Sequence, residues 1–214
     1  MVAREGLGLI LTFVTLSLAA LVMALAFNAR WGLIIASILA LGCLFLIYFF
    51  RDPRREIPGN PKLILSPSDG RVLSIDRLDW NDFLNSAAQK ISVFLSPVDV
   101  HIIRMPVSAS ISYSKYQKGS FKAAYRPQAS GQNENLELGL VSRQGKMILR
   151  QIAGFLARRI VCHARPSDNL DMGSRLGIIK FGSRVELIVP DKVAVKVKPN
   201  QRLIGGQTVI GEFI

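Results

Sequence analysis

One peptide bond in this chain of 214 residues has neighbours suited to self-processing, the bond between Gly182 and Ser183. A serine hydroxyl can attack the carbonyl before it where the backbone distorts easily, and glycine, which has no Cβ, distorts most easily. Apolar runs flank this bond on both sides, Ile178–Phe181 before it and Val185–Val189 after it. The same dipeptide occurs twice more, where we expect ordinary turns: Gly119-Ser120 and Gly173-Ser174.

A serine nucleophile needs a base to take its proton, and the sequence offers two candidates. Asp69 lies in a Ser-Pro-Ser-Asp-Gly segment that also has the composition of a β-turn, which is a rigid mount for a carboxylate. His101 follows Asp99 by two residues at the start of a predicted strand, so their side chains should share a face. His163, the other histidine, better fits a partly buried residue at a strand end. The choice between Asp69 and His101 stays open at this point.

Two uncharged runs near the N-terminus are each long enough to cross a bilayer: Gly6–Phe27, of 22 residues, and Trp31–Phe50, of 20. Three residues separate them, so we expect a tight antiparallel hairpin. A signal peptide is the competing interpretation of the first run, but its apolar stretch is too long and lacks a clear cleavage site. Basic residues concentrate at the two ends of the hairpin rather than in its loop. The positive-inside rule therefore places the rest of the chain in the cytoplasm, at the cell (inner) membrane.

The remainder of the chain is strongly basic. Without Arg4, Arg30 and Glu5, the 27 basic and 15 acidic residues become 25 and 14, a net charge of +11. Anionic lipid is the partner that this charge favours beside a membrane. Nucleic acid is the other standard partner, but no recognition-helix or RNP-like pattern is present, and we expect none to bind. Cys43 and Cys162 form no cluster with histidine, so neither a disulfide nor a metal site is expected.

After the hairpin, a proline-rich linker leads into short apolar or alternating runs separated by turn residues, which is typical of β structure. We therefore predict a mainly β fold: a membrane hairpin at 1–50, a linker at 51–62, and an antiparallel barrel-like or sandwich-like domain at 63–214. An amphipathic helix is predicted at Asp79–Ala88 and a long loop at Gly119–Asn135. The predicted strands are Val72–Ile75, Ile91–Leu95, Val100–Arg104, Ala109–Tyr116, Leu136–Ser142, Lys146–Ile152, Leu156–His163, Leu176–Phe181, Val185–Val189, Val193–Val197 and Thr208–Phe213.

Taken together, several segments resemble phosphatidylserine decarboxylase in its short, membrane-associated form. They cover most of the chain: the linker from Tyr48 to Arg55, Ser66–Val72, Ser96–Ser108, Gln151–Arg159 (QIAGFLARR) and Leu176–Pro190 (LGIIKFGSRVELIVP).

The resemblance implies a proenzyme that cuts itself between Gly182 and Ser183. The products are a β chain, 1–182, and an α chain, 183–214, which stay associated, while Ser183 becomes a pyruvoyl group. That covalent cofactor forms a Schiff base with phosphatidylserine, which loses CO2 to give phosphatidylethanolamine. Asp69 would help to activate Ser183, and His101 would act as acid or base, or orient the substrate carboxylate, in decarboxylation.

Two departures from long-form relatives stand out. Those relatives have Leu-Gly-Ser-Thr where this chain has Phe181 to Arg184, and a second histidine where this chain has Arg104. Arg104 is thus a candidate ligand for a substrate phosphate or carboxylate. The alternatives are a non-catalytic, membrane-tethered β-barrel binding module, in which Ser183 stays a serine, and a pyruvoyl decarboxylase of a soluble amino acid. The oligomeric state stays open, a homo-oligomer included.

Overall fold

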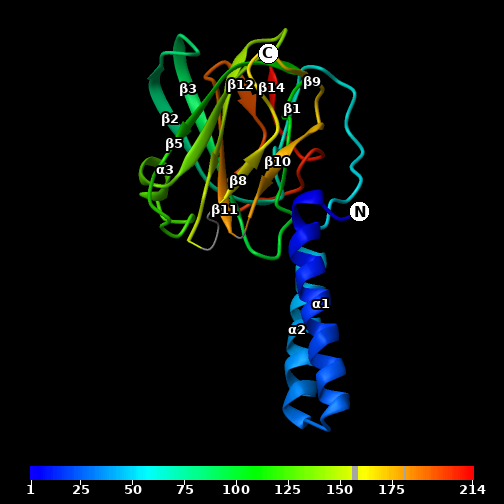
Figure 1. Ribbon diagram of the computed structural model, residues 1–214. Coiled ribbons are helices and arrows are strands. Elements are labelled where there is room, and N and C mark those ends of the chain that lie inside the picture. Colours follow the sequence, from blue (N-terminus) through cyan, green and yellow to red (C-terminus); the bar gives the residue numbers. More distant parts are fainter. Residues whose placement is uncertain (156–158, 181) are drawn as a thin grey trace. The chain divides into compact units, whose positions relative to one another are not determined.

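The computed structural model describes residues 1–155, 159–180 and 182–214. The chain divides into two compact units, Met1–Arg54 and Arg55–Ile214. The first contains two long helices, and the second is built from antiparallel strands with one short helix, α3 (Ala129–Gln132) (Figure 1). The predicted mainly β fold with two N-terminal apolar helices is thereby confirmed.

Helices α1 (Arg4–Ala26) and α2 (Arg30–Phe49) form the predicted hairpin. Their packing depends on small residues: a Cβ added at Gly32 would lie 2.7 Å from the Cβ of Ala24, so only glycine allows this approach. The open ends of the hairpin are tied together, because the backbone N–H of Ala3 donates to the carbonyl of Phe50 at 2.7 Å. By length and composition, both helices could cross a membrane.

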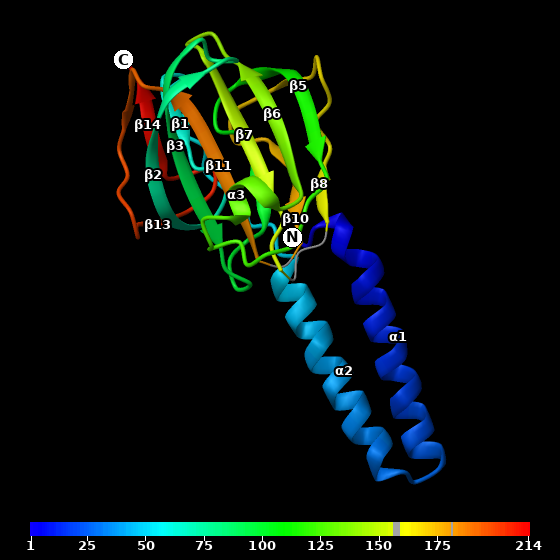
Figure 2. The ribbon, with the colours of Figure 1, turned by 90° about the vertical axis from the view of Figure 1, so that its left-hand side faces the viewer.

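The second unit contains three sheets, and every strand pair that the structure describes in them is antiparallel. The largest sheet has the order β13-β2-β3-β11-β7-β6-β5-β9 and curls into a half-barrel (Figure 2). The smaller sheets are β1-β14-β12 and β4-β10-β8. The strands are β1 (Leu63–Leu65), β2 (Gly70–Asn81), β3 (Ser86–Leu95), β4 (Ile102–Arg104), β5 (Ala109–Gln117), β6 (Asn135–Val141), β7 (Lys146–Ile152), β8 (Ile160–Cys162), β9 (Asn169–Leu170), β10 (Arg175–Ile179), β11 (Ser183–Pro190), β12 (Val193–Val195), β13 (Arg202–Leu203) and β14 (Val209–Phe213).

Strand β11 is buried along its whole length, between β3 and β7. Alternate side chains of β11, such as Val185 and Leu187, enter the main hydrophobic core together with Val93 of β3 and Leu149 of β7. A strand buried on both faces is held by neighbours on every side. The fold therefore gives the head of β11, where Ser183 lies, a fixed position.

The helix predicted at Asp79–Ala88 is wrong. These residues form the end of β2, a tight turn and the start of β3, with Asn81 paired to Ser86. The side chain of Asn81 accepts a hydrogen bond from the N–H of Leu84, and Asn85 adopts a left-handed φ of 54°. Asparagine and aspartate favour both helix ends and turns, and here strand pairing decides for the turn. Of the predicted strand Leu156–His163, residues 156–158 lie outside the described residues.

Candidate active site

Ser183, the first residue of β11, is fully buried and lies opposite Leu95 of β3. Its Oγ has no hydrogen-bond partner among the residues that the structure describes. A buried hydroxyl without a partner costs about 1–3 kcal/mol and is rare in native proteins, so it requires an explanation. Its lone pairs and its proton are free for chemistry. This is the state expected of a nucleophile held next to the bond that it attacks.

The backbone before Ser183 is in a conformation that favours glycine. Gly182 has a φ of 64°, in the left-handed region, and an added Cβ would meet only Pro97, at 3.9 Å. Position 182 therefore favours glycine because of its backbone conformation, and not because a side chain would lack space. Phe181, the residue before it in the predicted motif, lies outside the described residues.

A second glycine faces the carbonyl of Gly182. A Cβ built on Gly154, just after β7, would lie 2.0 Å from the Gly182 oxygen and 3.0 Å from its carbonyl carbon. These two atoms form the carbonyl group that Ser183 is proposed to attack. The absence of a side chain at Gly154 thus leaves room for the carbonyl that Ser183 must reach. The sequence analysis did not single out Gly154, since nothing in the local pattern around it indicates this contact.

The structure brings His101 to the same place. It is fully buried, and its Nε2 accepts a hydrogen bond of 3.1 Å from the backbone N–H of Gly182. Nδ1 lies 2.9 Å from the carbonyl oxygen of Asp99. An N–H pointing at Nε2 and a carbonyl at Nδ1 fix the neutral tautomer with its proton on Nδ1. The basic nitrogen is therefore directed at the residue that precedes Ser183.

Asp99 and His101 do not lie on one face of a strand, as the sequence predicted, because the described residues around them form no strand. Residues Pro97–Asp99 form a turn, and β4 begins only at Ile102. The Asp99 carboxylate accepts a hydrogen bond from the N–H of Ser96 and pairs with Arg202. What orients the imidazole is the backbone carbonyl of Asp99, a contact that side-chain patterns cannot indicate.

Asp69 is held by a basic partner. The Arg55 Nη2 lies 2.9 Å from both carboxylate oxygens, and the N–H of Gly205 donates to one of them at 2.8 Å. The side chains of Asp69 and Arg55 are 18% and 11% exposed, so the pair is largely shielded from water. In the contacts described, Asp69 thus stabilises its own turn rather than bonding to Ser183.

Arg104 projects from the end of β4. Its Nη1 donates to the carbonyl of Gly173 at 3.2 Å, and its Cδ lies 3.1 Å from the position of a Cβ at Gly206. Ile103, its neighbour in the strand, is fully buried in the main core. Arg104 is therefore positioned at this end of β4 by its hydrogen bond to Gly173.

A further polar group lies on the Ser183 face of the sheet. Gln151 of β7 pairs with Val185 of β11, two residues after Ser183, so the two side chains project to the same side. Gln151 is fully buried, and its side-chain amide lies beside the thiol of Cys162. Burial raises the pKa of the nearby Cys162 thiol, and hydrogen bonds from the backbone N–H of Ala164 and the side chain of Gln151 partly offset the rise. Cys162 therefore stays an uncharged thiol at neutral pH.

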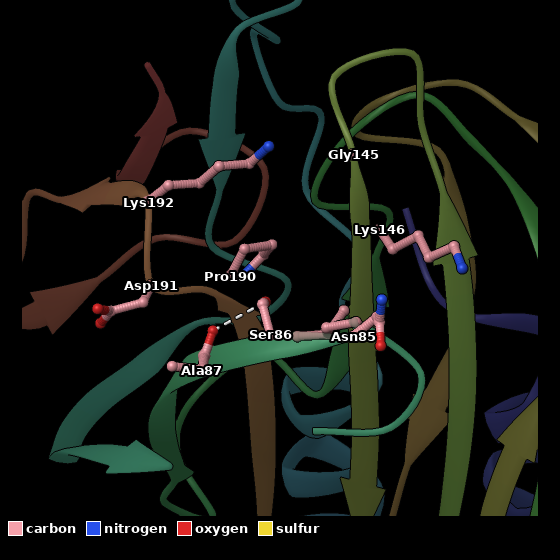
Figure 3. A pocket seen from close by; sticks show the side chains of 9 residues that line it. Asn85, Ser86, Ala87, Gly145, Lys146, Pro190, Asp191 and Lys192 are labelled. Carbon is pink, nitrogen blue, oxygen red and sulfur yellow. Dashed lines mark hydrogen bonds between the residues drawn. The ribbon is translucent and has the colours of Figure 1, made fainter. Parts of the chain in front are cut away.

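An apolar cavity of about 300 Å³ opens beside Gly182. It is lined by Phe94, Pro97, Ala123, Ala124, Tyr125, Phe155 and Gly182. Another hollow, of about 360 Å³, is shown in Figure 3 and lies around Pro190 and Lys192. Pro190 is seven residues along β11 from Ser183, roughly 23 Å at the rise of a β-strand. Of these two, only the cavity lined by Gly182 lies at the Ser183 end of β11.

Charged side chains cross the opposite face of the sheet from β11 to β5. Arg184 Nη2 lies 2.9 Å from Glu186 and donates to Ser92 Oγ at 2.7 Å, and Arg150 Nη1 lies 3.5 Å from Glu186. Arg150 also pairs with Glu137, which accepts a hydrogen bond of 2.8 Å from Tyr113.

Burial, followed by the hydrogen bond to Glu137, raises the pKa of Tyr113 above its ordinary value. A raised pKa favours the protonated form in the folded state. Tyr113 therefore contributes its full stabilisation below the unfolded pKa near 10, and loses it as the pH rises through the folded value.

The fold and these residues define a class: a curled antiparallel β protein with two apolar N-terminal helices and a buried Gly-Ser bond at the head of a central strand. Comparison with known proteins gives the family. The family model for phosphatidylserine decarboxylase matches residues 43–211.

Relatives match over nearly the whole chain. A phosphatidylserine decarboxylase proenzyme of Symbiobacterium thermophilum is 40% identical, with 99% of this chain and 95% of the relative covered. Proenzymes of the same name from Wolbachia pipientis wMel and from the Wolbachia of Brugia malayi are 38% and 39% identical. They cover 98% and 90% of this chain, and 90% and 85% of their own lengths. The chain belongs to the phosphatidylserine decarboxylase family.

Proposed function

We propose that the chain is the precursor of a pyruvoyl-dependent decarboxylase that converts phosphatidylserine to phosphatidylethanolamine and CO2. The observation that carries the proposal is the buried hydroxyl of Ser183, which has no hydrogen-bond partner among the described residues and directly follows a left-handed Gly182 contacted by His101. Membership of the family supports the reaction, and the names of the relatives describe them as proenzymes.

The first steps of the proposed processing involve only this chain. Ser183 Oγ attacks the Gly182 carbonyl carbon, so that a C–O bond forms, the Gly182–Ser183 C–N bond breaks and the freed nitrogen takes up the hydroxyl proton. His101 is the proposed carrier of that proton, since its basic nitrogen faces Gly182.

Loss of the Ser183 Cα proton then breaks the Cβ–Oγ bond, which releases the Gly182 carboxylate and leaves dehydroalanine. Water converts this to the pyruvoyl group with loss of ammonia. The new group would remain at the head of β11, held by pairing with β3 and β7.

The site has features that fit such a group. Its carbonyl provides an electrophile for the substrate amine and an acceptor for the electron pair that CO2 leaves behind. Gln151 offers a buried amide on the same face of the sheet, and His101 offers a proton carrier. Asp69 and Arg104 are proposed to support the site from the neighbouring turn, Asp69 through Arg55 and Arg104 as the group nearest to hand for a phosphate or carboxylate. The substrate enters through the apolar cavity beside Gly182.

The arrangement of the whole enzyme follows from the same proposal. Residues 1–50 anchor it in the cell (inner) membrane, 51–62 form the linker and 63–214 the catalytic domain on the cytoplasmic side. After cleavage, chains 1–182 and 183–214 remain associated, because β11 lies in the α chain and pairs with β3 and β7 of the β chain. Anionic phospholipid is the proposed partner.

The intact mass of the purified protein under denaturing conditions tests the proposal. We expect two chains divided after Gly182, the smaller beginning with a carbonyl-bearing residue, and phosphatidylethanolamine formed from phosphatidylserine. Ser183→Ala should leave one uncut chain without activity, because it removes the nucleophile. Ser120→Ala and Ser174→Ala, which alter the other two Gly-Ser pairs, are matched controls and should be cut normally. Wild-type protein that remains one unmodified chain and forms no product would favour the binding module.

The roles of His101 and Asp69 are separable by the rate of cleavage. We expect His101→Asn to slow it by about 100-fold or more, the usual contribution of a general acid or base. Asp69→Asn should cost less, and Arg55→Gln should reproduce its effect, since the pair acts together on the turn. Time courses of cleavage measure all three variants. A block in Asp69→Asn as complete as in Ser183→Ala, without a matching loss in Arg55→Gln, would assign the base to Asp69 instead.

A further inference from the structure

The mouth of the cavity beside Gly182 carries exposed apolar side chains. Tyr125 and Phe155, which line the cavity, are 57% and 66% exposed, and Val98, next to the lining residue Pro97, is 56% exposed. Large apolar groups are ordinary on a surface when they are scattered singly, but a contiguous group at the entrance of a binding site indicates a partner. We call Pro97, Val98, Tyr125 and Phe155 the rim.

Tyr125 belongs to a well-anchored loop between β5 and β6. The ring of Tyr125 stacks edge-to-face on Phe94 of β3, with centroids 6.0 Å apart. The buried side chain of Asn133 closes the loop by donating to the carbonyls of Lys122 and Ala153, both at 2.7 Å. These contacts hold Tyr125 outward although burial would be cheaper for its ring. The exposure of Tyr125 is therefore a feature of the fold.

The charge of this loop identifies its partner. Between residues 118 and 133 there are three basic residues, Lys118, Lys122 and Arg126, and no acidic residue. All three are exposed, as is Arg159, four positions after Phe155 in the sequence. Aromatic groups flanked by lysine and arginine fit the interface of a bilayer, where rings lie at the level of the head groups and cations meet anionic phosphate.

We propose that the rim docks on the surface of a bilayer containing anionic phospholipid, so that the catalytic domain takes its substrate directly from the membrane. This rests on the proposed function and adds to it a second membrane contact, made by the catalytic domain itself. Tyr125 and Phe155 enter the interface, Lys122 and Arg126 bind the phosphates around it, and the cavity opens toward the lipid head groups. The contact positions the site, whereas the apolar helices only tether the chain.

The test compares one enzyme on two physical forms of substrate. Full-length Tyr125→Ser/Phe155→Ser protein is assayed on mixed phosphatidylcholine–phosphatidylserine vesicles and on dihexanoyl phosphatidylserine below its critical micelle concentration. We expect its kcat/KM to fall at least about tenfold more on vesicles than on monomers, with self-cleavage still complete. Lys122→Gln/Arg126→Gln should also lose more kcat/KM on vesicles than on monomers. Its kcat/KM on vesicles should depend less on salt concentration than that of the wild type.

Trp80→Ser is the matched control. Trp80 is 58% exposed, comparable with Tyr125. It lies nine residues along β2 from Arg71, a strand length of about 30 Å, and Arg71 is the residue of β2 that pairs with Phe94 beside the cavity. It should retain wild-type rates on both substrates. Equal losses of the rim variant on vesicles and monomers, or no loss on vesicles, would overturn the docking proposal. Failure of the wild-type enzyme on both substrates would instead overturn the proposed function.

Discussion

Replacing Gly154 by alanine is expected to stop the cleavage after Gly182, although neither residue of the scissile bond is changed. The new Cβ would lie 2.0 Å from the Gly182 oxygen, far inside van der Waals contact. The atoms that must yield are backbone atoms of Gly182, with Ala124 behind at 3.2 Å. Displacing a reacting carbonyl by about 1 Å costs on the order of 100-fold in rate, so we expect at least that loss.

The measurement is the fraction of cut chain with time, by denaturing mass or gel. Hydroxylamine added to the denatured protein cuts an ester but leaves a peptide bond intact, so it shows whether the acyl shift has occurred. Gly154→Ala should give no hydroxylamine-dependent fragment. Gly131→Ala, in the same region of the chain but with nothing within 4 Å of its added Cβ, should be processed normally. A Gly154→Ala protein that folds and is cut at the wild-type rate would show that the carbonyl has room to move.

Gly154 also illustrates which features of the site cannot be predicted from the sequence. The apolar runs around Gly182-Ser183 predicted two flanking strands, and the structure has β10 and β11 there. Strand positions follow from local alternation, which depends on burial of one face. The contact of Gly154 with Gly182 depends instead on how β7 ends beside the head of β11. Residues 28 positions apart carry no local pattern that indicates such a crossing.

The two base candidates illustrate the same limit. His101 was predicted because histidine titrates near neutral pH, and its ring does reach Gly182. Asp69 was predicted from a Ser-Pro-Ser-Asp-Gly segment that also suits a turn, and its carboxylate pairs with Arg55. The sequence contains both groups, but not the distance between them, because that distance depends on the packing of separate sheets. Gln151 was missed because glutamine within an apolar strand run has no distinctive spacing.

Removing the charge of Glu186 is expected to destabilise the catalytic domain by about 3–5 kcal/mol, the usual cost of leaving one member of a buried ion pair alone. Glu186 is fully buried, and Arg184, 2.9 Å away, has a side chain only 5% exposed. In Glu186→Gln, Arg184 would keep its hydrogen bond to Ser92 but lose its counter-charge. For a domain of this size, the loss corresponds to a fall in Tm on the order of 10 °C.

A second variant tests whether the Arg184–Glu186 ion pair adds to the stability of the sheet, or whether only the loss of one partner is harmful. The oxygens of Glu186 form ion pairs but, among the described residues, no hydrogen bond of good geometry, so the desolvation of both charges is incompletely offset. We therefore expect the double replacement Arg184→Met/Glu186→Leu to recover most of the stability that Glu186→Gln loses. All melts belong in the Ser183→Ala background, where every chain is uncut and the comparison concerns folding alone. A double variant no more stable than Glu186→Gln would mean that the ion pair itself stabilises the sheet. In that case Arg184, directly after Ser183, would stabilise β11, the strand that carries the nucleophile.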